Sequence, residues 1–141
     1  MSRYSRLIGI DVGTKWVGLA RTDLLRMVAN PIGTYPPPEA IEKLKKLVET
    51  EQVEKLVIGW PLTPEGGEGR AIKMVERFIT RLRLVLPEIE IAKMDERYTS
   101  KEAVAAMVES GVPKMKRRDS DRVNQAAAAI ILQKYLDETG S

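Results

Sequence analysis

Five short strand-like segments, arranged in a fixed order with amphipathic helical segments, constrain the fold of this chain more than any other feature. Apolar, β-branched or alternating residues predict strands at 6–12, 16–22, 26–35, 55–59 and 88–94, the third broken by Pro31. Apolar residues at helical spacing predict helices at about 39–51, 71–85, 100–109 and 120–137. The order βββαβαβαα predicts an α/β fold with a five-stranded mixed sheet flanked by helices.

The connections of the last two strands bring candidate functional residues to one edge of this sheet. Each of these strands is reached through a helix, and right-handed crossovers of that kind make the first, fourth and fifth strands parallel. Ligands of such sheets bind beyond the carboxyl ends of the parallel strands. Asp11 lies near the end of the first strand, and Asp95 and Glu96 directly follow the fifth. We therefore expect these acids to meet at one edge.

The composition narrows the chemistry that this chain can perform. The 141 residues fit one domain, 1–141, and include neither histidine nor cysteine. Nucleophile systems that need histidine, histidine-ligated zinc and disulfides are therefore excluded, and catalysis must use carboxylates, Lys, Ser, Thr, Tyr or a bound metal. Neither a membrane-spanning apolar run nor a signal peptide is visible, so we expect a cytoplasmic protein with no membrane partner.

Acids at the ends of strands suit a divalent-metal site. Hydrolysis of a phosphodiester needs an activated water and a stabilised leaving oxygen, and two Mg²⁺ ions about 3.5–4 Å apart can supply both. Because Mg²⁺ prefers oxygen ligands, Asp11 and Glu96 are candidate metal ligands and catalytic residues, with a third oxygen ligand expected from the last helix. The alternatives are structural. Asp11 could only hydrogen-bond the following turn, and Glu96 could be solvated or paired with Arg97.

Basic residues add evidence for a polyanionic partner. The net charge is +3 and the isoelectric point is about 9.2, which is a weak bias toward nucleic acid. Lys15 could contact a scissile phosphate or the Asp11 carboxylate, and Arg97 could contact a phosphate or orient Glu96. A cluster just before the last helix could contact phosphates or could be a solvated loop: Lys114, Lys116, Arg117 and Arg118.

Four sequence blocks resemble one known family. In chain order they are Gly9 to Lys15 with Gly18 to Ala20, Val57 to Leu62, Asp95 to Ser100, and Ala126 to Leu136. They span nearly the whole chain and resemble the motifs of the YqgF/RuvX family of Holliday junction resolvase-like proteins. The Asp-Glu-Arg sequence followed by hydroxyl residues is a fairly specific part of this resemblance.

The resemblance implies a ribonuclease H-like fold and a nuclease that depends on Mg²⁺ or Mn²⁺. The family is linked to processing of the 5′ end of precursor 16S rRNA in ribosome biogenesis and, by similarity, to resolution of four-way DNA junctions. Its acidic positions correspond to Asp11 and Glu96. Its third acid normally precedes the alanine-rich run, where this sequence has Asn124, a neutral ligand that should hold a second metal less well. Asp121, one helical turn earlier, could complete the site or only stabilise the start of the helix.

Three functional hypotheses follow. The leading one is a metal-dependent phosphodiester endonuclease, a hydrolase acting on structured RNA or branched DNA. It would be a homodimer if it cuts a junction symmetrically, because that requires two sites. The alternative is a non-catalytic nucleic-acid-binding or ribosome-assembly factor on the same fold, favoured by Asn124. The third takes residues 11–14 as the phosphate loop of an actin-like or sugar-kinase ATPase, but those enzymes enclose ATP between two such domains.

Overall fold

The computed structural model describes residues 4–61, 67, 69–96 and 120–139, with the side chains of 120–122 outside this description. Its elements are β1 (Arg6–Val12), β2 (Val17–Thr22), β3 (Ala29–Tyr35), α1 (Pro37–Thr50), β4 (Val53–Trp60), α2 (Ala71–Val85), β5 (Glu90–Asp95) and α5 (Ser120–Thr139). The five predicted strands and three of the predicted helices are confirmed. The helix predicted near 100–109 lies outside the described residues. In the described part of the chain, no helix is both long and apolar enough to cross a membrane.

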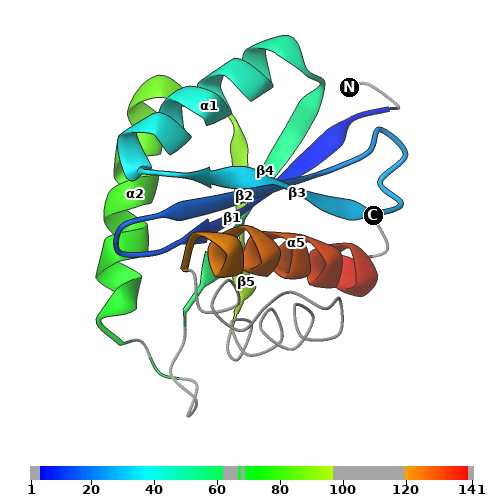
Figure 1. The fold of residues 1–141 in the computed structure, drawn as a ribbon. Helices are drawn as coiled ribbons and strands as arrows, with labels where there is room; N and C mark the ends of the chain where they lie inside the picture. The colour runs from blue at the N-terminus through cyan, green and yellow to red at the C-terminus, as the bar shows by residue number, and fades with distance from the viewer. Residues whose placement is uncertain (1–3, 62–66, 68, 97–119, 140–141) are drawn as a thin grey trace.

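The five strands form one mixed sheet in the order β3-β2-β1-β4-β5 (Figure 1). β2 pairs antiparallel with both β1 and β3, and β4 pairs parallel with both β1 and β5. The predicted parallel arrangement of β1, β4 and β5 is therefore confirmed. The carboxyl ends of these three strands, at Val12, Trp60 and Asp95, share one edge of the sheet.

Helices cover both faces of the sheet, with α1 and α2 on one face and α5 on the other (Figure 1). Ile8 and Val12 of β1 pack in the apolar core on the α1–α2 side, whereas Leu7 packs in the smaller core under α5. Successive side chains of a strand point to opposite faces, so Asp11 shares the α5 face with Leu7. The buried apolar residues of β1 thus fix the face on which this acid lies.

The connection between β2 and β3 explains why β3 begins three residues later than predicted. The Asp23 carboxylate accepts hydrogen bonds from two backbone N–H groups of this connection, at 2.9 and 3.0 Å. Arg26 adopts a left-handed backbone conformation with φ of 55°. Its guanidinium donates hydrogen bonds to the carbonyl and hydroxyl oxygens of Ser5 and to Glu54. These contacts hold 23–28 as a turn.

Pro31 lies on β3, at the edge of the sheet. It pairs with Ala20 of β2, and the register of the two strands shifts between Leu19 and Ala20. Because proline has no N–H to donate, it fits an irregularity on an edge strand better than a central ladder. The predicted break at Pro31 is therefore a register shift within one continuous strand.

Candidate active site

Asp11 and Glu96 lie together at the carboxyl edge of the parallel strands. Asp11 is the second-to-last residue of β1 and is 8% exposed. Glu96 directly follows β5, and its backbone N–H donates a hydrogen bond of 3.2 Å to the carbonyl oxygen of Trp60, the last residue of β4. The side chains of Asp11 and Glu96 are hydrogen-bonded to each other. The topology thus joins two acids from distant parts of the sequence, as we expected.

Burial makes the charges of this pair unfavourable and raises both pKa values. For the Asp11 carboxyl, burial raises the pKa, and the hydrogen bond with Glu96 acts in the opposite direction. For Glu96, burial together with the hydrogen bond to Asp11 and the negative charges of Asp11 and Asp95 raises the pKa to about 10. Glu96 therefore keeps its proton at neutral pH and donates it in the hydrogen bond to the Asp11 carboxyl.

Glycines on the α5 face surround Asp11 and leave the space that the acid pair occupies. Gly18 of β2 pairs directly with Asp11, and a Cβ atom on Gly18 would lie 2.1 Å from the carbonyl oxygen of Asn124 in α5. A Cβ atom on Gly59 of β4 would lie 2.7 Å from the carboxyl carbon of Glu96. A side chain at Gly18 would displace α5, and a side chain at Gly59 would displace the Glu96 side chain. Both glycines therefore leave space beside Asp11 for these groups.

Sequence reasoning missed this role of the glycines, although a signal was present. Gly9 and Gly59 each interrupt an apolar strand, and an isolated glycine in a strand indicates a close approach of another group. At Gly9 that group is α5, because a Cβ atom there would lie 2.6 Å from the carbonyl oxygen of Ala128. At Gly59 it is the side chain of Glu96.

Asn124, at the position where a third acid is expected, lies on α5 beside the turn that follows β1. Its Nδ2 donates a hydrogen bond of 3.1 Å to the carbonyl oxygen of Trp16, and a Cβ atom on Gly13 would lie 2.9 Å from the same Nδ2. The side chain therefore ties α5 to the β1–β2 turn, and a carboxylate could not do so because it has no N–H. Asp121 lies near the start of α5, and its side chain is outside the described residues.

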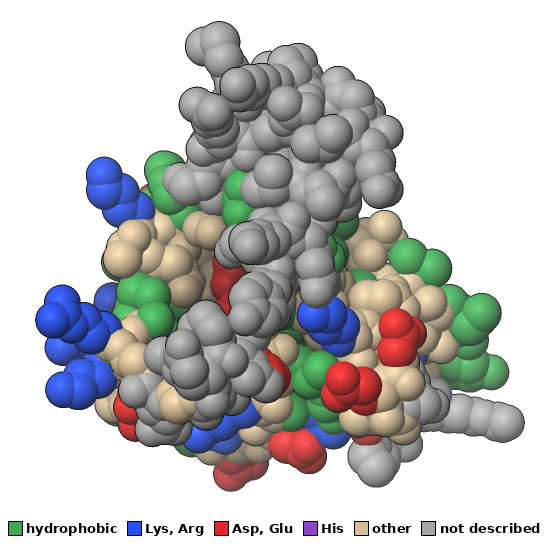
Figure 2. All heavy atoms as spheres, turned by 90° about the horizontal axis from the view of Figure 1, so that it is seen from below, with side chains coloured by type: hydrophobic (Ala, Val, Ile, Leu, Met, Phe, Trp, Pro, Cys, Tyr) green, Lys and Arg blue, Asp and Glu red, His purple; other side chains and the backbone are tan. Residues whose placement is uncertain are grey.

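Of the residues predicted to contact phosphates, the structure describes Lys15, which is exposed in the β1–β2 turn. The others lie outside the described residues: Arg97, Lys114, Lys116, Arg117 and Arg118. Figure 2 shows one face of the molecule, on which several Lys and Arg side chains gather along one side.

The described residues supply two carboxylates for a metal ion. Among them, no group of three or more Asp, Glu, His or Cys side chains lies close enough together to hold one. Asp11 and Glu96 offer the oxygen donors that divalent ions such as Mg²⁺ prefer. Further ligands would have to come from Asn124, from Asp121, from water or from a substrate phosphate.

Comparisons with known proteins agree on the family. The family model described as "RuvX: Holliday junction resolvase" matches residues 5–138. A protein of Salinibacter ruber named "Putative pre-16S rRNA nuclease" is 47% identical over 140 residues, which cover 99% of this chain and 98% of that protein. A protein of Chlorobium phaeobacteroides with the same name is 37% identical over 136 residues, which cover 96% of this chain and 94% of that protein.

The chain also resembles a solved structure, "T. thermophilus RuvC in complex with Holliday junction substrate". The TM-score is 0.59 over 98% of both chains, at 12% sequence identity. This likeness concerns the fold alone, and it confirms the predicted ribonuclease H-like fold. Because the family model and the curated relatives each cover nearly the whole sequence, this chain belongs to the RuvX family.

Proposed function

We propose that this chain is a phosphodiester endonuclease, a hydrolase that uses a divalent metal ion to cut structured nucleic acid. The observation that carries the proposal is the hydrogen-bonded pair of Asp11 and Glu96, enclosed at the carboxyl edge of the parallel strands. Paired carboxyls in such surroundings are unfavourable for folding and are typical of functional sites. The names of the family model and of the curated relatives support nuclease chemistry.

The donor set fits Mg²⁺ or Mn²⁺. Asp11 would hold the ion from the end of β1, and Glu96 would do so from the end of β5 once its proton is released. When bound, the metal supplies an activated water and neutralises charge on the phosphodiester. Asn124 or Asp121 would complete the site with an oxygen ligand. The close cover of α5 over β1 keeps the Asp11 carboxylate in a fixed position, which positioning of a reacting phosphate requires.

The name of the relatives favours precursor 16S rRNA as the substrate. We place the cut at the 5′ end of this RNA, in the cytoplasm during ribosome biogenesis. The family description names the Holliday junction, a four-way DNA structure, instead. Both substrates are structured polyanions, so Lys15, Arg97 and the basic residues of 114–118 would contact phosphates in either case. Symmetric cutting of a junction would need two sites and hence a homodimer.

Cleavage by the purified protein tests this proposal. We expect the wild type with Mg²⁺ or Mn²⁺ to cut precursor 16S rRNA or a four-way junction, and EDTA to stop the reaction. Asp11→Asn and Glu96→Gln should abolish cutting and leave the circular dichroism spectrum unchanged. Glu88→Gln is the matched control, because this exposed acid precedes β5 and lies at the opposite end of that strand from Glu96. Intact substrates in the presence of both ions would refute the proposal.

One observation favours a second candidate, a non-catalytic nucleic-acid-binding or ribosome-assembly factor on the same fold. The amide of Asn124 serves packing, through its hydrogen bond to Trp16, at the position where a third acid is expected. A site with fewer anionic ligands holds a second ion less tightly. Salt-sensitive RNA binding that is equal in the wild type and in Asp11→Asn, without cleavage, would favour this candidate.

A further inference from the structure

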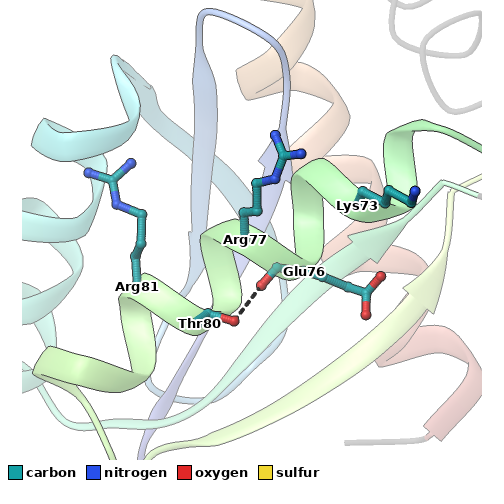
Figure 3. A pocket seen from close by; sticks show the side chains of 5 residues that line it. All are labelled: Lys73, Glu76, Arg77, Thr80 and Arg81. Carbon is teal, nitrogen blue, oxygen red and sulfur yellow. Dashed lines mark hydrogen bonds between the residues drawn. The ribbon is translucent and has the colours of Figure 1, made fainter.

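The exposed side of α2 carries a row of basic residues that the candidate active site does not use. Lys73, Arg77 and Arg81 follow one another at intervals of four residues, which places them on one side of the helix. All three are exposed and line one pocket, together with Glu76 and Thr80. Figure 3 shows this pocket, with the side chains of Arg77 and Arg81 projecting to the same side of α2. We call Lys73, Arg77 and Arg81 the basic row.

Stability of the fold does not account for the basic row. Within the described residues none of its members forms an ion pair, because the salt bridges there involve other basic residues: Arg6, Arg21, Arg26 and Lys55. Like charges four residues apart on a helix repel each other. The first turn of α2 also lacks an acidic residue to complement the positive end of the helix. The basic row therefore concentrates positive charge and lowers the stability of the isolated helix.

A second hollow connects the basic row with the end of β1. Arg77 and Arg81 line this hollow together with residues 12–14, which directly follow Asp11 in the sequence. Val12 faces the α1–α2 side of the sheet, whereas Asp11 faces α5. The end of β1 therefore has the acid pair on one side and two arginines on the other. A strand that crosses this edge of the sheet can touch both.

We propose that the basic row is a second contact surface for the phosphate backbone of the bound nucleic acid, outside the candidate active site. This inference rests on the proposed function for the nature of its ligand. Four residues of helix rise by about 6 Å, close to two nucleotide steps of about 3.4 Å along one strand. The guanidinium group also matches the geometry of phosphate oxygens. Such contacts would position an arm of a structured substrate without reading its sequence.

Binding measured without cleavage tests the inference. The wild-type chain is titrated in EDTA against two fluorescent probes, a four-way DNA junction and a hairpin from the 5′ region of precursor 16S rRNA. The slope of log K against log salt counts phosphate contacts, at roughly 0.7 to 0.9 per contact. We expect Arg77→Gln with Arg81→Gln to lower the slope by about 1.4 to 1.8 and the affinity by about 10- to 30-fold at 0.15 M salt. Arg77→Lys with Arg81→Lys should keep the slope.

The matched control is Lys45→Gln with Lys46→Gln. This variant removes two exposed charges from α1, on the same face of the sheet, and neither lysine lines the two pockets of the basic row. Its slope should equal that of the wild type. An unchanged slope in the double glutamine variant of α2, or the same loss in the control, would overturn the inference. The inference would also be overturned if the wild type bound neither probe. A lower urea midpoint of the α2 variant would overturn it as well, because the basic row would then contribute to the stability of the fold.

Cleavage by the wild type with metal is a separate result. Cleavage combined with an unchanged slope would refute the second contact surface and leave the proposed function intact. A lowered slope without cleavage would refute the proposed function and leave the contact surface intact. A change confined to one probe would identify whether RNA or DNA supplies the phosphates.

Discussion

Replacing Asp11 by asparagine should stabilise the metal-free protein and abolish its proposed activity. The ordinary pKa values of Asp11 and Glu96 are 3.8 and 4.5, and both values are raised in the fold. Above about pH 4.5 the folded state therefore holds more protons than the unfolded state, and the free energy of unfolding falls as the pH rises. One extra proton corresponds to about 1.4 kcal/mol per pH unit, so the wild type should lose up to about 2.7 kcal/mol between pH 6 and pH 8.

In the Asp11→Asn variant this dependence should be weaker. The amide can donate a hydrogen bond to the Glu96 carboxylate, and the repulsion within the pair is gone. Part of the slope should remain, because Glu96 is still removed from water. We expect about half of the wild-type slope or less, and a variant that is more stable by about 1 to 2 kcal/mol at pH 8.

Urea unfolding at pH 6, 7 and 8 in EDTA, followed by circular dichroism, measures these differences. The chain has no histidine and no cysteine, so few other side chains titrate in this window. The terminal amine does titrate there, but it is common to both proteins and cancels in their difference. A wild type whose stability does not fall between pH 6 and pH 8, or an Asp11→Asn variant that is less stable at pH 8, would refute the reasoning.

Three further substitutions test other parts of the structure. Gly59→Ala places a Cβ atom 2.7 Å from the carboxyl carbon of Glu96, so this side chain must move and cleavage should fall to background. Urea unfolding should show a loss of about 1 kcal/mol or less, because the displaced atoms are the ends of flexible side chains. Asn124→Asp adds an anionic ligand but removes the hydrogen bond to Trp16. The metal-free protein should lose about 1 kcal/mol, and Mn²⁺ affinity measured by calorimetry should rise about tenfold. Arg26→Ala releases the β2–β3 turn and should cost about 2 kcal/mol in urea unfolding, with cleavage unchanged because this turn lies at the opposite end of β2 from the β1–β2 turn.

Matched controls separate these effects from general damage. Gly33→Ala controls for Gly59→Ala, because a Cβ atom there would first meet the Tyr35 hydroxyl, at 3.0 Å, and not a side chain of the candidate site. Asn30→Asp adds a carboxylate to the exposed edge strand and should leave Mn²⁺ affinity unchanged. Normal cutting by Gly59→Ala, unaltered Mn²⁺ affinity in Asn124→Asp, or wild-type stability in Arg26→Ala would each contradict the corresponding prediction.

The elements and topology of this fold could be predicted because local patterns determine them. The apolar spacing of α2, ended by Pro87, predicts a helix over 71–85, which are its observed bounds. Two helical crossovers likewise place Glu96 at the same edge as Asp11. The face on which Asp11 lies could not be predicted, because β1 is buried on both faces and shows no alternation. The start of β3 could not be predicted, because the turn before it depends on contacts between Arg26 and the distant Glu54.

The chemistry of the site could be predicted only in part. Residue types identify Asp11 and Glu96, but their raised pKa values depend on how deeply the fold buries them. The hydrogen bond from Asn124 to Trp16 joins residues far apart in the sequence, and no local pattern contains it. The spacing of Arg77 and Arg81 is visible in the sequence, yet their position next to the end of β1 follows from packing of α2 on the sheet.

The absence of a side chain at Gly59 helps to interpret the sequences of proteins related to this chain. Loss of either acid is plain in an alignment, whereas a methyl group at this one position would leave both acids in place and still keep them apart. A relative with alanine at this position would keep both acidic residues, but the side chain that corresponds to Glu96 could not occupy the position beside Asp11 that it has here. The acidic residues alone would then identify such a protein as an enzyme, although its acid pair could not form.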